Sequence, residues 1–314
     1  MNSRAFRKFK TEMGQANHFL ITIMIGLDAV EDGAEKRNSF TTTWNPKNKS
    51  ASVVRSKQYA IKSALAWTVD NLDMYLRLCN REPRLYHEEE SIEIVKTKLS
   101  VYRKFECVIH NHSELTVNKF AYVDLLICWR NNSVHFDAEN QLMSESIEYF
   151  KNISEDDVVT NTYHLDVEQM LDRFKRGDCP TFKEAATLIS MTIHFVEELD
   201  SIILRDIEQY RFLETSLFKF LKSENTTSIF SFKNTTSEKR KKKLKQFFAT
   251  VGISEDFYNE DGERFIDEVV NLKEDEFIRK VLEKRKEEET KTAEPSYGTE
   301  ILSHKKITEP TPRK

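Results

Sequence analysis

The stretch Leu125–Asn140 reads LLICWRNNSVHFDAEN, and the residues before it read FAYVD. This apolar run predicts a buried helix. The run then changes abruptly to Arg130, two asparagines and a serine, and His135 follows. On an ideal helix Arg130 and His135 would point about 140° apart. Because asparagine and serine are poor residues for a helix interior, we expect the helix to end or distort between them. That break would turn the imidazole back towards the guanidinium.

The composition around this stretch predicts an all-α protein. The 314 residues include only 7 Gly and 6 Pro, so turns are few and the secondary-structure elements should be long. Leu, Ile, Lys and Glu recur at spacings of three and four residues, and no sustained alternation typical of strands is present. The fold class that we expect is therefore all-α.

The long helices are predicted to pack as an up-and-down bundle. A capping box of Thr181 and Glu184 begins its last helix, which should run to about residue 207. Earlier helices are predicted over residues 6–35, 53–80, 89–109, 115–131 and 164–176. The expected domains are a helical bundle over 1–207, a linker over 208–236, a small helical domain over 237–289 and a disordered tail over 290–314.

Apolar residues at helical spacing predict the face that each of the first two helices buries. The expected core stripes are Phe19, Ile23, Leu27 and Val30 in the first helix, and Tyr59, Ala60, Leu65, Trp67, Val69, Leu72, Tyr75 and Leu76 in the second.

The N-terminus superficially resembles a signal peptide, because the basic residues of RAFRKFK precede the apolar run FLITIMIGL. We favour a core helix instead. The apolar run is short, and Asp28, Glu31 and Asp32 follow it directly. With no other long apolar run, the sequence predicts a soluble cytoplasmic protein with no membrane contact.

No metal or cofactor site is expected. The four cysteines (Cys79, Cys107, Cys128 and Cys179) form no C-x-x-C pair and are expected to be reduced. Phosphate-binding glycine loops, nucleophile elbows and zinc-protease motifs are missing from the sequence. The tripeptide His110-Asn111-His112 lacks the distant ligands of a metal-dependent nuclease and is read as a polar helix end. His164 and His194 have no partner at metal-ligand spacing.

Arg130 and His135 together suit the chemistry of a phosphodiester. An arginine is permanently cationic and binds phosphate through two parallel hydrogen bonds, whereas a histidine titrates at about pH 6.5 and can pass a proton in either direction. In RNA the neighbouring 2′-hydroxyl is a built-in nucleophile. A base, an acid and a cation over the phosphorus could therefore suffice for cleavage without a metal.

These residues resemble the HEPN family. Arg130-Asn131-Asn132-Ser133-Val134-His135 fits the R-x4-6-H signature of that family, with a polar residue directly after the arginine and an apolar helix before it. HEPN domains are helical bundles, commonly dimeric, and many are metal-independent endoribonucleases of toxin–antitoxin, CRISPR-associated and antiphage systems. The resemblance extends over about residues 1–207, although its specific part is about twenty residues long.

The resemblance implies a composite site. Arg130 and His135 of two protomers would face each other across a homodimer interface, and Asn131 would orient the pair or the phosphate. The family often adds a polar residue from a neighbouring helix, and either Asp70 or Asp73 could take that place. RNA is the implied substrate, and a regulatory or antitoxin partner is implied in a setting of prokaryotic stress or phage defence.

Three alternatives stay open at the level of sequence. Arg130 could simply meet the dipole at a helix C-terminus, with His135 packed in the loop that follows. The chain could be a non-catalytic HEPN module that binds RNA, a nucleotide or a partner protein. It could also be a plain helical interaction protein without any such site.

A basic run near residue 240 gives a second candidate for RNA contact. Lys241, Lys242 and Lys243 could follow a nucleic-acid backbone, with Phe247 and Phe248 available for stacking. The competing interpretation is an amphipathic helix whose phenylalanines seal the small domain. The net charge of −4 argues against broad nonspecific affinity for RNA, so any RNA site must be local.

Overall fold

The computed structural model describes residues 2–283, except for residues 38, 97–99, 135–140, 155–156, 224–234, 251–252, 274, 278 and 281–282. Over these residues the fold is all-α, as predicted, and contains no strand. The helices are α1 (Arg4–Glu31), α2 (Lys49–Cys79), α3 (Glu88–Lys96), α4 (Val101–Asn111), α5 (Val117–Val134), α6 (Ser144–Lys151), α7 (Val158–Tyr163), α8 (Val167–Lys175), α9 (Phe182–Asp206), α10 (Gln209–Ser223), α11 (Ser237–Thr250) and α12 (Glu260–Asn271), with a 3₁₀ turn at Glu255–Phe257.

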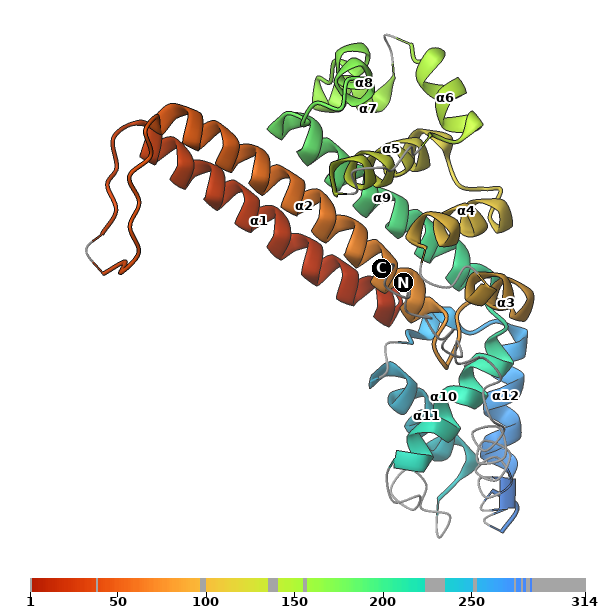
Figure 1. Ribbon diagram of the computed structural model, residues 1–314. Helices are drawn as coiled ribbons and strands as arrows, with labels where there is room; N and C mark the ends of the chain where they lie inside the picture. The colour runs from red at the N-terminus through yellow and green to blue at the C-terminus, as the bar shows by residue number, and fades with distance from the viewer. Residues whose placement is uncertain are drawn as a thin grey trace, which may run out of the picture.

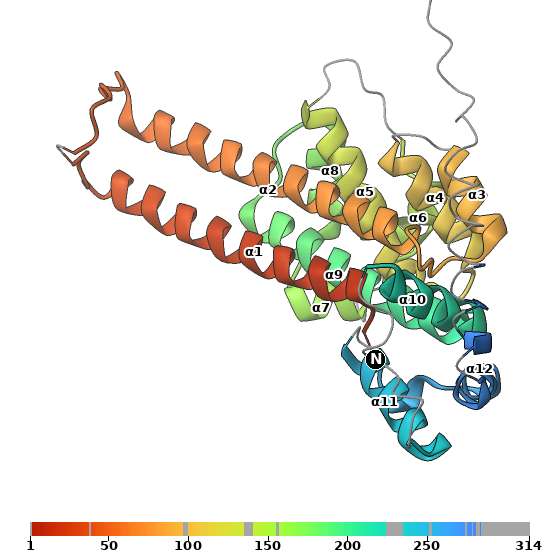
Figure 2. The same cartoon turned by 90° about the horizontal axis from the view of Figure 1, so that it is seen from below.

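The helices are arranged around α9, which contacts α1, α2 and α5. The helices α1 and α2 form a long antiparallel hairpin whose far half projects from the rest of the molecule (Figures 1 and 2). The helices α10, α11 and α12 gather at the other end, below the N-terminus of α1 in Figure 1. One continuous apolar core joins these parts, because buried residues of every long helix belong to the same cluster.

The capping box predicted at the start of α9 is present. The backbone N–H of Glu184 donates to the Thr181 hydroxyl at 3.2 Å, and the backbone N–H of Thr181 donates to the Glu184 carboxylate at 2.7 Å. Two of the free N–H groups at the helix end are thereby satisfied. The same carboxylate also pairs with Arg173 of α8 at 3.0 Å, so the cap connects the two helices.

Thr181→Ala is expected to lower the free energy of unfolding by about 1 kcal/mol, because it removes the side-chain acceptor at the helix N-terminus. Urea unfolding of the two proteins would measure the change. Thr11→Ala is the matched control, since Thr11 lies within α1 and bonds only the preceding turn. An equal loss in both variants would contradict a capping role for Thr181.

The predicted core stripes of α1 and α2 are partly wrong. Phe19 is 59% exposed, Tyr59 is 75% exposed, and Ile23 and Trp67 are also exposed. The reason is that each helix of a projecting pair is covered on one side only. Leu20 of α1 and Ala60 of α2 are buried where the pair meets, and the apolar residues on the flanks stay in contact with solvent.

Two element boundaries also differ from the prediction. The structure has a helix, α10, over most of the range predicted as a linker, because Leu213, Leu217 and Leu221 recur every four residues and are buried beside α12. The helix predicted over 89–109 is instead two helices, and Ser100 caps the second of them by accepting the Arg103 N–H at 3.3 Å. The predicted tail over 290–314 lies outside the described residues.

Candidate functional site

The helix that carries the candidate site, α5, is buried on all sides over residues 120–129. Such a helix belongs in a core. Trp129 fixes its end, because the indole N–H donates to the Asp178 carbonyl at 2.9 Å and the ring packs edge-on against Phe174 of α8. Arg130 is the first residue beyond this buried segment that solvent reaches. The packing of α5 in the core therefore fixes the position at which the Arg130 guanidinium reaches the surface.

Arg130 is held by two neighbours. One terminal nitrogen donates to the Asp70 carboxylate of α2 at 3.2 Å, and the other donates to the side-chain oxygen of Asn131 at 3.0 Å. The guanidinium side chain is 21% exposed, whereas Asp70 is 68% exposed. The Nε of Arg130 is buried and donates to no residue that the structure describes. A planar donor group is thus oriented in advance, and two of its five N–H groups make these bonds.

The two acids that the sequence could not separate have different partners. Asp73 accepts from Lys104 of α4 at 2.6 Å and pairs with Arg77 at 2.8 Å, and its side chain is largely buried. It therefore ties α2 to α4. Asp70, one turn earlier, is the acid that contacts Arg130. Of the two candidates, only Asp70 stands with Arg130 and Asn131.

The break expected between Arg130 and His135 is not where the sequence placed it. The helix α5 continues through Asn131, Asn132 and Ser133 to Val134, so those residues are helical rather than distorted. Their side chains are at least partly accessible there, which removes the cost of burying them in a helix interior. His135 lies outside the described residues.

Asp124 is a single carboxylate inside the apolar run of α5, and no role for it was predicted from the sequence. Its side chain is fully buried and accepts the Met143 N–H at 2.7 Å, which holds the start of α6 against α5. The Cys128 thiol lies one turn further and donates to it at 3.7 Å. Burial raises the pKa of Asp124 to about 6, and the Met143 hydrogen bond opposes this rise. An acid within an otherwise apolar helix was the available sequence signal.

Asp124 should make stability depend on pH. Below about pH 4 it is protonated in both the folded and the unfolded chain; between about pH 4 and 6 the unfolded chain ionises first, so the free energy of unfolding falls. The total fall is roughly 3 kcal/mol, and it is complete above about pH 6. Urea unfolding from pH 4 to 7 should show this slope in the wild type and lose it in Asp124→Asn. Asp206→Asn, at an exposed position, is the control and should keep the wild-type slope. An unchanged slope in Asp124→Asn would contradict the assignment.

The basic run of α11 is not brought to the candidate site. It lies with α10 and α12 at the other end of the molecule from α5 (Figure 1). Lys241 pairs with Glu263 and Asp267 of α12, both at 2.8 Å, while Lys242 and Lys243 are exposed. The charge of the run is therefore partly offset by the neighbouring helix.

The phenylalanines of α11 are not available for stacking on bases. Phe247 is almost entirely buried and Phe248 is fully buried, where its ring meets Phe265 of α12. The interpretation in which these side chains seal the helical packing is the correct one, and stacking on RNA by Phe247 and Phe248 is ruled out in this fold.

The H-N-H tripeptide closes a helix end, as predicted. His112 caps α4, and its Nε2 lies 3.0 Å from the Glu90 carboxylate of α3 in a largely buried pair. Asn111 donates to Glu93 at 3.0 Å, and the Nδ1 of His110 lies against a backbone carbonyl of its own helix. These contacts fasten α3 to α4.

No group of three or more potential metal ligands occurs in the part of the chain that the structure describes. All four cysteines are free thiols, with Cys79 and Cys128 buried and Cys107 and Cys179 partly buried. His164 ends α7, and His194 pairs weakly with Glu197 at 3.8 Å on α9.

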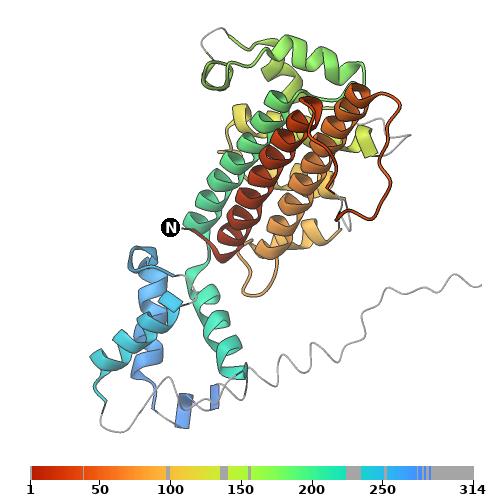
Figure 3. The same cartoon turned by 90° about the vertical axis from the view of Figure 1, so that its left-hand side faces the viewer.

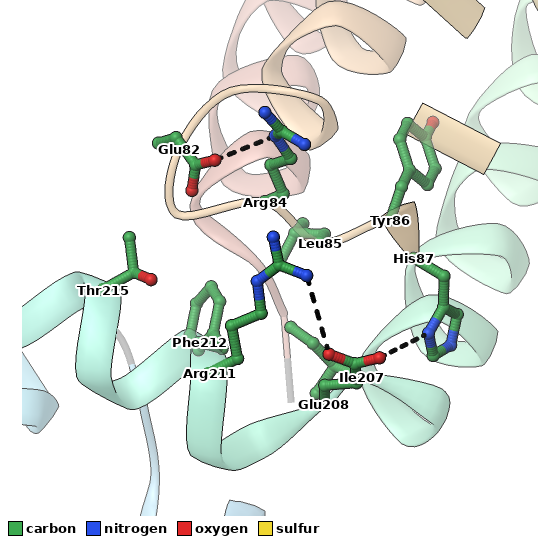
Figure 4. Close-up of a pocket in the computed structure, with 10 residues that line it drawn as sticks. All are labelled: Glu82, Arg84, Leu85, Tyr86, His87, Ile207, Glu208, Arg211, Phe212 and Thr215. Carbon is green, nitrogen blue, oxygen red and sulfur yellow. Dashed lines mark ion pairs between the residues drawn. The ribbon is translucent and has the colours of Figure 1, made fainter. Parts of the chain in front are cut away.

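A small cavity lies between the loop before α3 and the start of α10 (Figure 4). Glu208 reaches across it towards His87 at 3.5 Å and Arg211 at 4.0 Å. Its volume of about 20 Å³ holds about one water molecule. It is too small for a nucleotide and contains none of the site residues predicted from the sequence.

A larger, open groove of about 410 Å³ follows α9 and the start of α5. Its charges are paired with each other: Lys119 with Glu198 at 3.3 Å, and Arg205 with Glu114 at 2.6 Å. It also contains none of the predicted site residues. Arg130 with Asp70 and Asn131 is therefore the candidate site that both the sequence and the geometry support.

Searches of protein-family models, curated proteins and solved structures give no match for this chain. Within the described residues, no helix is both long and apolar enough to cross a membrane.

Proposed function

We propose that this chain is a HEPN-type helical bundle that homodimerises and cleaves RNA without a metal. Arg130 stabilises the negative charge that develops on phosphorus, His135 acts as general base or acid, and Asn131 orients the guanidinium. The observation that supports the proposal best is the state of Arg130. A buried helix delivers it to the surface, Asp70 and Asn131 orient it, and its Nε–H is used by no described residue.

The proposed reaction is a transesterification within the RNA strand. The 2′-oxygen attacks the adjacent phosphorus while its proton passes to a base, and the bond from phosphorus to the 5′-oxygen breaks as an acid protonates that oxygen. The products are a 2′,3′-cyclic phosphate and a 5′-hydroxyl. In a composite cleft formed by two protomers, two histidines are present, so one can serve as the base and the other as the acid. The guanidinium forms two parallel hydrogen bonds to the phosphorane oxygens.

Asp70 has a positioning role in this proposal. Its carboxylate holds the guanidinium in the absence of RNA and is itself largely exposed. An exposed ion pair contributes at most about 1 kcal/mol, so a phosphate can replace the carboxylate at low cost. The same pair supports the alternative function, a non-catalytic HEPN module that binds RNA, a nucleotide or a partner protein, because a neighbouring carboxylate lowers the attraction of Arg130 for a phosphorane.

The proposed setting is cytoplasmic stress response or phage defence in a prokaryote, where a nuclease must be restrained until it is triggered. The helices α10 to α12, packed beyond the end of α9, are candidates for that restraint or for contact with a regulatory partner. Lys242 and Lys243 of α11 are exposed there and are the remaining basic residues of the run that could meet RNA.

The test is incubation of the purified full chain with end-labelled RNA in excess EDTA. We expect cleavage that EDTA does not prevent, with a 2′,3′-cyclic phosphate and a 5′-hydroxyl at the new ends. RNA binding without cleavage would favour the non-catalytic module. Products carrying 5′-phosphate, or cleavage that EDTA abolishes, would refute the proposed mechanism.

A further inference from the structure

The far half of the α1–α2 hairpin is unusually apolar for a surface that none of the other helices described by the structure covers. Beyond Met13, Leu20 is the one buried residue of α1, a helix that the structure describes in full. Ile25 is 65% exposed, and other large apolar side chains of the hairpin are also exposed: Phe19, Ile21, Ile23, Phe40, Trp44, Val54, Tyr59 and Trp67. Exposed apolar surface of this extent marks an interaction site.

The charge distribution along α1 is equally unusual. Residues 13–27 contain no Asp, Glu, Lys or Arg on any side of the helix. A helix that packs on one side only normally carries charged residues on its solvent side. Basic residues are found before this segment and acidic residues follow it. The helix is therefore positive near its start, neutral in the middle and negative near its end.

One exposed face of α1 carries this pattern as a continuous stripe. Residues spaced alternately three and four apart share a face of a helix. Figure 3 shows α1 with α9 on one side and α2 on the other. The stripe runs along exposed positions of α1 to the C-cap residue Asp32, and near its end Asp28 also pairs with Lys57 of α2 at 2.5 Å. We call it the α1 stripe; its members, all exposed, are Arg7, Lys10, Gly14, His18, Ile21, Ile25, Asp28 and Asp32.

The α1 stripe is complementary to itself when two copies run antiparallel. Arg7 then lies opposite the partner's Asp32, and Lys10 lies opposite the partner's Asp28. The midpoint of Arg7 and Asp32 falls between residues 19 and 20, and the midpoint of Lys10 and Asp28 falls at residue 19. A single two-fold axis can therefore relate both pairs. Within the chain, Lys57 of α2 pairs with both Asp28 and Glu31, so at the end of α1 these two acids and Asp32 outnumber the lysine that reaches them.

The apolar part of the stripe fits the same axis. Gly14 lies opposite the partner's Ile25, and His18 lies opposite the partner's Ile21, again with midpoints between residues 19 and 20. Gly14 has open space where a side chain would stand, so it can receive the exposed isoleucine. Close to a two-fold axis a residue meets its own copy, and a charge there would face a like charge. The neutral segment avoids that repulsion.

We propose that α1 pairs antiparallel, through the α1 stripe, with α1 of a second copy of the chain. The other exposed flank of α1, through Phe19 and Ile23, lacks this complementarity. At its start the charges of Lys8 and Glu12 offset each other, and at its end there is no acidic residue. One helix pair of this length is small beside typical specific interfaces, so the expected dissociation constant is micromolar.

This interface does not rest on the proposed nuclease activity. Arg130 lies on α5 and contacts Asp70 of α2, whereas the stripe consists of exposed positions of α1. Pairing through the stripe therefore leaves both copies of Arg130 away from the shared axis. A wild-type monomer would count against both proposals, because the composite cleft also needs two copies of the chain. The stripe variants separate the two proposals, since they change α1 and leave Arg130 unaltered.

Charge reversal tests the register of the pair by sedimentation velocity of the full chain from about 1 to 100 µM. Arg7→Glu/Lys10→Glu and Asp28→Lys/Asp32→Lys should each weaken self-association by about tenfold or more, since each places like charges at both ends of the homodimer. Mixing the two variants should restore dimers, because every end then meets an opposite charge. A single chain carrying all four substitutions should also dimerise.

The apolar part is tested by Ile21→Glu/Ile25→Glu, which should raise the dissociation constant at least tenfold. Gln15→Glu is the matched control, because Gln15 is exposed in the same neutral segment but outside the stripe. Circular dichroism should show unchanged helix content in every variant. A wild-type monomer at 100 µM, an equal effect of Gln15→Glu, or mixed charge variants that do not pair would each overturn the proposal. So would vesicle binding lost in the isoleucine variant with self-association unchanged, which would assign the stripe to a membrane surface.

Discussion

Replacing Arg130 or His135 with alanine is expected to lower the rate of RNA cleavage by about 10²- to 10⁴-fold. Arg130→Ala removes the cation that faces the charged phosphorane, and His135→Ala removes the group that moves the proton. Single-turnover cleavage of a labelled RNA in excess EDTA would measure both rates. The double variant should lose little more activity than either single variant, because the effects on the rate of substituting residues that stabilise one transition state are not additive.

A conservative substitution at Arg130 and control substitutions on other helices test whether the loss of rate is specific to the candidate site. Arg130→Lys keeps the charge but loses the planar pair of donors, so it should restore only part of the rate. Arg103→Ala on α4 and His194→Ala on α9 are matched controls, since both side chains are exposed and lie on other helices. Both controls should keep the wild-type rate within about twofold, in line with substitutions at surface positions.

Cleavage at the wild-type rate by Arg130→Ala and His135→Ala would contradict the proposed mechanism outright. A wild-type protein that binds RNA tightly without cutting it, with binding weakened in Arg130→Ala, would identify the non-catalytic module instead. Thermal unfolding of each variant is needed beside the rates, because Arg130 is largely buried and its loss can also affect stability.

Local signals in the sequence were sufficient where the structure depends on neighbours in the chain. Thr181 and Glu184 are three residues apart, and the hydrogen bonds that join them need nothing from the rest of the fold. The burial of the helix before Arg130 was also readable from the sequence, because its apolar residues, interrupted only by Asp124, occupy every side of the helix. Both features were predicted correctly.

Choices that depend on tertiary contacts could not be made from the sequence. Asp70 and Asp73 lie on the same helix, three residues apart, and both are acids. Which of them reaches Arg130 and which reaches Lys104 depends on where α5 and α4 cross α2. The position at which two helices cross is set by the side chains of both helices, so the residue pattern of one helix does not determine it.

The exposed apolar residues of the hairpin show a second limit. Phe19 and Leu20 are adjacent and equally apolar, yet one is exposed and the other is buried. When a helix is apolar on several sides, its pattern does not say which side meets its neighbour. If α1 pairs with a second copy as proposed, part of this surface is covered only in the assembly, which one chain cannot reveal.

Asp200→Ala is expected to cost about 3 to 5 kcal/mol in the free energy of unfolding, because it strips partners from several buried donors at once. The Asp200 carboxylate on α9 accepts from the Ser3 backbone N–H at 2.8 Å, from the Ser3 hydroxyl, and from the Tyr75 hydroxyl at 3.1 Å. It thereby ties the start of α1 and the C-terminal end of α2 to α9. Burial raises the pKa of Asp200, while the bonds from Ser3 and Tyr75 oppose the rise.

Urea unfolding at pH 7 would measure the loss, and hydrogen exchange should show faster opening of the first turn of α1. Asp200→Asn keeps one acceptor oxygen but replaces the other with a donor, so its loss should be smaller. Asp206→Ala, at the exposed end of the same helix, should change stability by about 0.5 kcal/mol or less. In a double-mutant cycle, Ser3→Ala should recover part of the cost of Asp200→Ala, since the orphaned hydroxyl is then absent. A loss below about 1 kcal/mol for Asp200→Ala, or strict additivity with Ser3→Ala, would show that this buried cluster does not anchor α1.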